Sequence, residues 1–93
     1  MYAVVVTVNI TGAAQSDSQR KVLREQIVPQ VSKTPGFVKG YWTGRADGMQ
    51  GLSLVVFDTK EHAEAAANMA PSSPFPPGVT LSNVEVREVV AEA

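Results

Sequence analysis

The chain has 93 residues, which is apolar material for one hydrophobic core, so a single domain over residues 1–93 is expected. Hydrophobic residues make up 44% of it and charged residues 18%, a composition that excludes an intrinsically disordered chain. Eight basic residues are dispersed among nine acidic ones, which argues against nucleic acid as a partner. Cysteine is absent, which removes disulfides, thiolate nucleophiles and cysteine-based metal sites.

The first residues carry neither the basic region nor the cleavage site of a secretory signal. No apolar run approaches the roughly 20 residues of a membrane span. We therefore expect a cytoplasmic protein without membrane contact. A domain of this size buries only about two-thirds of its unfolded surface, so a further interface would add stability, which favours an oligomer.

Residues Tyr2 to Ile10 are predicted to form a central strand. Every even position is apolar, whereas the odd positions, from Ala3 to Asn9, form a more mixed second face.

The first helix is predicted to start near Asp17, because Ser16 and Gln19 have the spacing of a capping box. Its apolar stripe follows at helical spacing: Val22, Leu23, Ile27 and Val31. Pro29 cannot donate to the carbonyl of Glu25 and clashes with it, so we expect a kink or a change of register before Thr34-Pro35-Gly36 ends the helix.

A hairpin and a second helix follow. Residues 37–46 and 52–58 read as strands joined by a turn at 47–50. Asp58 and Glu61 have capping-box spacing and open an Ala-rich helix from Thr59 to about Ala70. Proline-rich residues 71–78 form a loop, and residues 80–90 form the last strand.

This order of elements predicts an α+β fold of ferredoxin-like βαββαβ type, with a four-stranded antiparallel sheet and two helices on one face. The helix-covered face is expected to carry Val4, Val6, Leu52 and Leu54. The opposite face would then expose Val5, Val55 and Phe57, an apolar patch that a monomer rarely tolerates. Two such sheets packed face to face would bury it, which predicts a homodimer.

Two short phrases carry a resemblance to a known family: Thr34-Pro35-Gly36-Phe37-Val38, opening the second strand, and Val55-Val56-Phe57-Asp58, running into a capped helix. With the order of elements, they resemble the dimeric α/β-barrel superfamily, and within it the antibiotic-biosynthesis-monooxygenase-like group. The resemblance implies a dimeric barrel. Members include cofactor-free oxygenases acting on electron-rich polycyclic aromatics, haem-degrading enzymes and proteins without assigned activity.

The haem-degrading members carry an Asn on the first strand, a Trp in the second helix and a His further along. Asn9 matches the first of these, but the helix from Thr59 has no Trp and no His follows His62. The resemblance therefore implies that the protein uses no cofactor. Many relatives place a Trp where this chain has Phe57, which keeps an aromatic wall without the indole N–H.

Four residues are candidates for substrate binding: Asn9, Tyr41, Trp42 and Phe57. Asn9 has the alternative of a local backbone hydrogen bond near the end of its strand. Trp42 can stack on a flat substrate or pack in the core under a helix. Tyr41 lies on the alternate face and suits either the barrel interior or the rim of a dimer interface.

No residue is assigned a catalytic role from the sequence. His62 is the one side chain with an unperturbed pKa near neutrality, but its place in the first turn of a helix argues for solvent exposure. No nucleophilic triad, metal-ligand spacing or phosphate-binding loop is found. The leading hypothesis is a cofactor-free monooxygenase acting on a small aromatic substrate. The alternative is a non-catalytic dimer that binds a small apolar ligand or acts as an interaction module.

Overall fold

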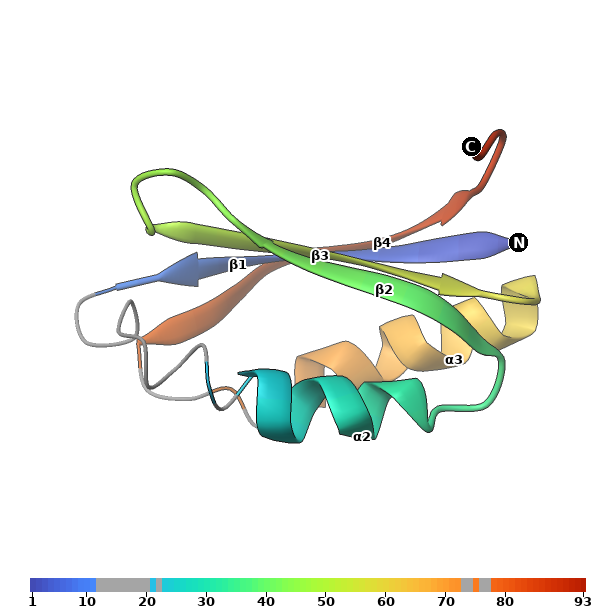
Figure 1. Cartoon of the computed structure of the whole chain (residues 1–93), viewed down its shortest axis with the longest axis horizontal. Coiled ribbons are helices and arrows are strands. Elements are labelled where there is room, and N and C mark those ends of the chain that lie inside the picture. Colours follow the sequence, from blue (N-terminus) through green and yellow to red (C-terminus); the bar gives the residue numbers. More distant parts are fainter. Residues whose placement is uncertain (12–20, 22, 73–74, 76–77) are drawn as a thin grey trace.

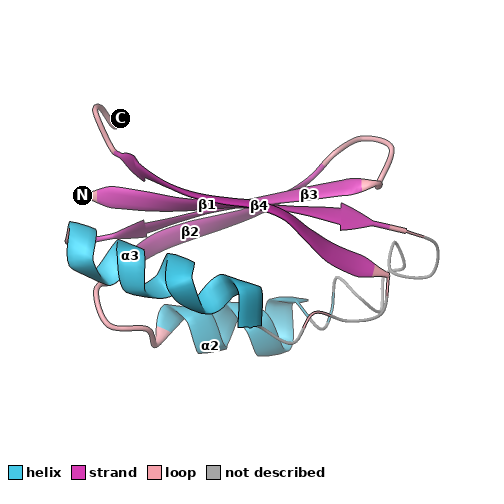
Figure 2. Ribbon diagram, turned by 180° about the vertical axis from the view of Figure 1, so that it is seen from behind, coloured by secondary structure: helices cyan, strands magenta, loops and turns pink. Residues whose placement is uncertain are grey.

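A four-stranded antiparallel sheet with two helical segments on one face forms the fold (Figures 1 and 2). The computed structural model describes residues 1–11, 21, 23–72, 75 and 78–93. The strands are β1 (Tyr2–Ile10), β2 (Phe37–Gly44), β3 (Gln50–Phe57) and β4 (Val79–Glu88), and their order in the sheet is β2-β3-β1-β4. The ferredoxin-like α+β prediction is confirmed. None of the helices in the described residues is long and apolar enough to cross a membrane.

The first helical segment changes its hydrogen-bonding register, as Pro29 predicts. It consists of a π-helical stretch, η2 (Leu23–Ile27), that continues into α2 (Val28–Ser32). Pro29 stands at the start of α2, where its missing N–H and its fixed φ angle are tolerated best. The predicted helix start near Asp17 lies outside the described residues.

The second helical segment begins one residue later than the sequence pattern indicates. It comprises α3 (Lys60–Met69) and the short η3 (Ala70–Ser72). The N-cap is Thr59, whose hydroxyl accepts a hydrogen bond from the backbone N–H of His62 at 3.2 Å. The prediction that Asp58 caps this helix is wrong, because its carboxylate is engaged with the His62 imidazole instead.

The register between β1 and β3 corrects the predicted face of β3. Val4 pairs with Val55, and Tyr2 pairs with Phe57. Partners in an antiparallel ladder lie on the same face, so Val55 and Phe57 lie under the helices with Val4. Leu54 pairs with Val5 on the opposite face, together with Val56 and Leu52. The expectation that Val55 and Phe57 form the open face is therefore wrong.

The core lies at the end of the sheet where α3 begins. Phe57 and Ala63 are 1% and 0% exposed, and Val4 and Val55 are buried beside them. Ala63 allows α3 to approach the sheet closely, so this end of the molecule is filled by side chains. Beyond β4, residues 89–93 rise on the side of the sheet away from the helices (Figure 1).

Candidate functional site

A cavity of about 1230 Å³ lies between the sheet and the helices. Its floor is the helix-facing side of the sheet, with Val6, Val8 and Ile10 of β1 along it. Its roof comes from the two helical segments, including Ile27, Val31, Ala66 and Met69. Its size is above the range of about 300–1,000 Å³ that is usual for small-molecule sites. The described lining is mostly apolar.

Small residues at helix-facing positions create this space. Along β3, Val55 and Phe57 fill the core end, but the next residues on the same face are Ser53 and Gly51. Gly44 of β2 pairs with Gly51, so neither strand supplies a large side chain to the floor there. The roof above is Ala-rich where α3 faces the sheet. Interiors are normally close-packed, so small residues on both surfaces leave a cavity.

Trp42 forms an aromatic wall of the cavity. It lies on the helix-facing side of β2, opposite Ser53, and packs at the edge of the core. Its ring lies over Gly40, because a Cβ atom placed on Gly40 would be 2.9 Å from Cη2 and Cζ3 of the indole. Phe57 and Phe75 also line the cavity, but Phe57 is buried in the core, so the aromatic surface open to a flat molecule comes from Trp42 and Phe75.

Polar side chains are a minority of the described lining, and they include Thr34, Thr43, Gln50 and Ser72. The Ser53 hydroxyl is in the floor beside Trp42, and within the described part of the chain it has no hydrogen-bond partner. It can donate a hydrogen bond to a bound molecule or accept one from it. The helices add Gln26 and Gln30. Among the described lining residues, Arg24 is the one charged side chain.

The structure separates the four predicted substrate-binding residues into two groups. Trp42 and Phe57 line the cavity, on the helix-facing side of the sheet. Tyr41 lies on the opposite face, where it pairs with Leu54, is 60% exposed, and touches the cavity at its edge. Asn9 is exposed and alternates with Val8 and Ile10, so it falls on the face away from the cavity.

His62 lies outside the cavity lining, near the start of α3. Its Nδ1 is 2.7 Å from Oδ1 of Asp58, and this hydrogen bond lowers the pKa of the Asp58 carboxyl. Both side chains pack over Gly36, whose φ of 83° and lack of a Cβ permit the close approach. The Gly36 carbonyl accepts a hydrogen bond from the Asp58 backbone N–H at 2.9 Å. The His62–Asp58 pair therefore stabilises the loop before β2.

Sequence reasoning missed Ser53 and Arg24. The signal that could have found Ser53 is the run of small residues at alternate positions, Gly51 and Ser53, in an otherwise large-residue strand. Arg24 could not be found this way, because its placement depends on the π-helical register of η2.

Comparisons with known proteins show a shared fold. No protein-family model and no curated protein matches the chain. A solved structure of the heme-degrader MhuD from Mycobacterium tuberculosis, with two hemes bound in its active site, superposes with a TM-score of 0.71 and 15% identity. The match covers 100% of this chain and 99% of that one.

The ActVA-Orf6 monooxygenase of Streptomyces coelicolor, in complex with the ligand Nanaomycin D, is also similar. It superposes with a TM-score of 0.57 and 13% identity, covering 99% of this chain and 92% of that one. The resemblance to the antibiotic-biosynthesis-monooxygenase-like group is thus confirmed at the level of the fold.

The residues of this chain do not fit a haem held through histidine. The sequence contains one histidine, His62, and it is paired with Asp58 away from the cavity lining. Tyr41 touches the cavity at its edge from the opposite face. Haem iron is usually held by an axial histidine, cysteine thiolate or tyrosine that faces the cofactor, and methionine serves as a second ligand beside histidine. The described residues also contain no group of three or more His, Cys, Asp or Glu that could hold a metal ion.

Proposed function

We propose that this protein binds a small aromatic substrate in the cavity between the sheet and the helices and acts as a cofactor-free monooxygenase. One observation carries the proposal: a large, mostly apolar cavity has an aromatic wall at Trp42 and a Ser53 hydroxyl without a hydrogen-bond partner among the described residues. The fold shared with the ActVA-Orf6 monooxygenase supports the reaction class by analogy.

The substrate itself must supply the electrons in this reaction. In an anthrone, loss of a proton from the ring methylene gives a carbanion that passes electrons to dioxygen. One oxygen atom becomes the new carbonyl and the other leaves as water, so the methylene is oxidised by four electrons and dioxygen is reduced by four. The described lining contains no Asp, Glu, His or Lys, so we expect the proton to pass to water and the substrate to be acidic at carbon.

The chain would contribute binding and desolvation. Trp42 would stack on the ring system, and the Ser53 hydroxyl would donate a hydrogen bond to an oxygen substituent on which charge develops. The apolar walls would exclude water and so strengthen that hydrogen bond.

Oxygen uptake with anthrone tests the proposal. Wild-type protein should consume one dioxygen per anthraquinone formed, faster than anthrone alone in the same buffer. Ser53→Phe, which fills the floor of the cavity, should return the rate to the protein-free value. Leu54→Phe is the matched control, because Leu54 is the adjacent residue on the opposite face of β3 and lies outside the cavity lining. Equal rates for wild type and Ser53→Phe would remove the cavity from the reaction.

The alternative function is binding without turnover. It is favoured by the same absence of an acidic or basic side chain other than Arg24 among the described lining residues. Saturable binding of anthrone without oxygen uptake above background would select this alternative.

We also infer that two copies associate through the sheet face opposite the helices. That face carries Val5, Leu54 and Val56, with the exposed Tyr41 and Leu52 beside them. A hollow of about 420 Å³ lies over it, bounded by the sheet and by residues 89–93. An apolar sheet face without a helical cover favours a second copy as the occupant, because a two-fold dimer pairs the same patch of both subunits.

A further inference from the structure

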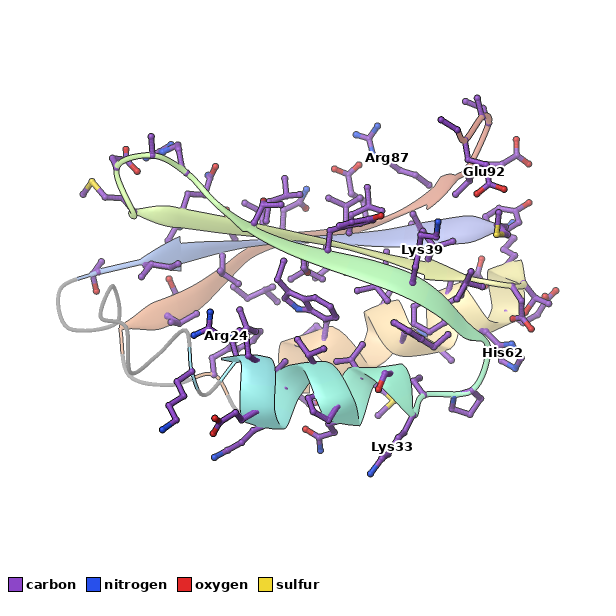
Figure 3. The ribbon with its side chains drawn as sticks, viewed as in Figure 1. Arg24, Lys33, Lys39, His62, Arg87 and Glu92 are labelled. Atoms are coloured by element: carbon purple, nitrogen blue, oxygen red, sulfur yellow. The ribbon has the colours of Figure 1, made fainter. Side chains whose placement is uncertain are left out.

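Arg24 stands out in the cavity lining because of its charge. Every other described lining residue is neutral. Within the described residues, Arg24 makes no ion pair with a carboxylate. Figure 3 shows its side chain extending from the helix toward the sheet.

The position of Arg24 follows from the π-helical stretch. It is the second residue of η2, and its neighbours Leu23, Gln26 and Ile27 also line the cavity. π-helical turns are frequently found at functional sites. Here Pro29 favours the register change and so helps to set the direction in which Arg24 extends.

A guanidinium at the edge of an apolar cavity favours one ligand chemistry. Arginine presents several N–H donors that match a carboxylate, sulfonate or enolate, and it stays charged at any physiological pH. Arg24 is exposed at the edge of the cavity, so such a pair is partly screened by solvent and weakened by salt. No described lining residue carries a negative charge that would oppose an anion.

We propose that Arg24 selects an anionic aromatic ligand, pairing with an acidic substituent while the ring system lies against Trp42. This inference deepens the proposed function, on which it rests, by naming the substrate class as aromatic acids or enolates. Arg24 is a specificity-determining residue in this account and takes no part in bond making.

Two fluorescent probes with one carbon skeleton test it. 8-Anilino-1-naphthalenesulfonate is anionic, whereas N-phenyl-1-naphthylamine lacks the sulfonate and is neutral. Wild-type protein should bind the anionic probe more tightly than the neutral one. Arg24→Gln should weaken binding of the anionic probe about three- to fivefold, the size of one exposed ion pair, and leave the neutral probe unchanged.

Lys21→Gln is the matched control. Lys21 is exposed and outside the cavity lining, so its loss removes the same formal charge without touching the site. It should leave both affinities unchanged. Added NaCl should weaken the anionic probe on wild type and have little effect on Arg24→Gln.

The outcomes separate this inference from the proposed function. Equal loss of the anionic probe in Arg24→Gln and Lys21→Gln would overturn the role of Arg24 and assign the effect to net charge. If Arg24→Gln leaves the affinity for the anionic probe unchanged while Ser53→Phe abolishes binding of both probes, the role of Arg24 is overturned and the cavity proposal stays intact. Probe binding that Ser53→Phe does not affect would place the probes outside the cavity and refute both.

Discussion

The indole of Trp42 lies across Gly40, two residues earlier on the same face of β2. A Cβ atom on Gly40 would come within 2.9 Å of two ring carbons, closer than real Cβ contacts allow. The ring can therefore occupy this position because Gly40 has no side chain. Since Trp42 is a wall of the cavity, Gly40 helps to set the shape of the proposed site.

Gly40→Ala should displace the Trp42 indole and reshape the cavity. We expect a loss of stability of about 1–3 kcal/mol, typical of overpacking, together with a weaker affinity for aromatic ligands. Gly44→Ala is the control for stability in the same strand, because a Cβ there meets nothing within 4 Å. Chemical denaturation and Trp fluorescence would measure both variants. Equal behaviour of the two variants would show that the ring is free to move.

Lysine substitutions on neighbouring residues of β3 should separate folding from assembly. Val55→Lys places a charge in the helix-covered core and should cost about 3–5 kcal/mol, enough to unfold a marginally stable domain. Leu54→Lys places it on the opposite face and should leave the fold intact while preventing dimer formation.

Light scattering with circular dichroism is the measurement. Wild type should give about twice the chain mass of 9.9 kDa, and folded Leu54→Lys should give the chain mass itself. A monomeric wild type would rule out the dimer, and a dimeric Leu54→Lys would place the interface elsewhere.

The order of elements could be predicted from the sequence, but which side chains of β3 lie under the helices could not. Periodicity, capping residues and prolines mark every strand and helix to within a few residues. In β3, however, Leu52, Leu54 and Val56 are as apolar as Val55 and Phe57, so hydrophobic alternation does not indicate the buried face. The pairing of Val4 with Val55 decides it, and pairing register is a tertiary property.

The candidate site was predictable in part for a similar reason. Trp42 was predicted to face the helices or a substrate, and it lies between the core and the cavity. Asn9 was chosen because it is polar and matches the family pattern, but it lies on the face away from the cavity, so a ligand contact at Asn9 would need a different site. The cavity itself exists because Gly44, Gly51 and Ser53 have small side chains or none. A pattern of hydrophobic residues in the sequence does not reveal such a space.

The Asp58–His62 hydrogen bond should make stability depend on pH in the acid range. It lowers the pKa of Asp58 in the folded protein below its ordinary value of 3.8. A carboxyl with a depressed folded pKa contributes stability above the unfolded pKa and loses it as the pH falls through the folded pKa. The difference in Tm between wild type and Asp58→Asn should therefore be largest above about pH 4 and shrink toward pH 2. A difference that stays constant with pH would assign the effect to packing over Gly36.

Haem should not bind as a ligated cofactor. The one histidine is paired with Asp58 outside the cavity lining, so haem iron has no histidine to bind there. Titration with hemin should give no saturable one-to-one Soret shift. A stoichiometric shift that persists in His62→Ala and disappears in Ser53→Phe would contradict this expectation and place haem in the cavity.

Binding of an aromatic ligand beside Trp42 is the central claim, and the fluorescence of Trp42 can measure it directly. Trp42 is the single tryptophan, so quenching of its fluorescence reports on the cavity. Titration with a hydroxyanthraquinone should quench wild type saturably, with one ligand per chain. Ser53→Ala should weaken the affinity several-fold through loss of one hydrogen bond of about 1 kcal/mol, and Ser53→Phe should abolish binding. Asn9→Ala, on the face away from the cavity, should bind as wild type does. Saturable quenching that is unchanged in Ser53→Phe and reduced in Asn9→Ala would contradict the account and move the site to the other face of the sheet.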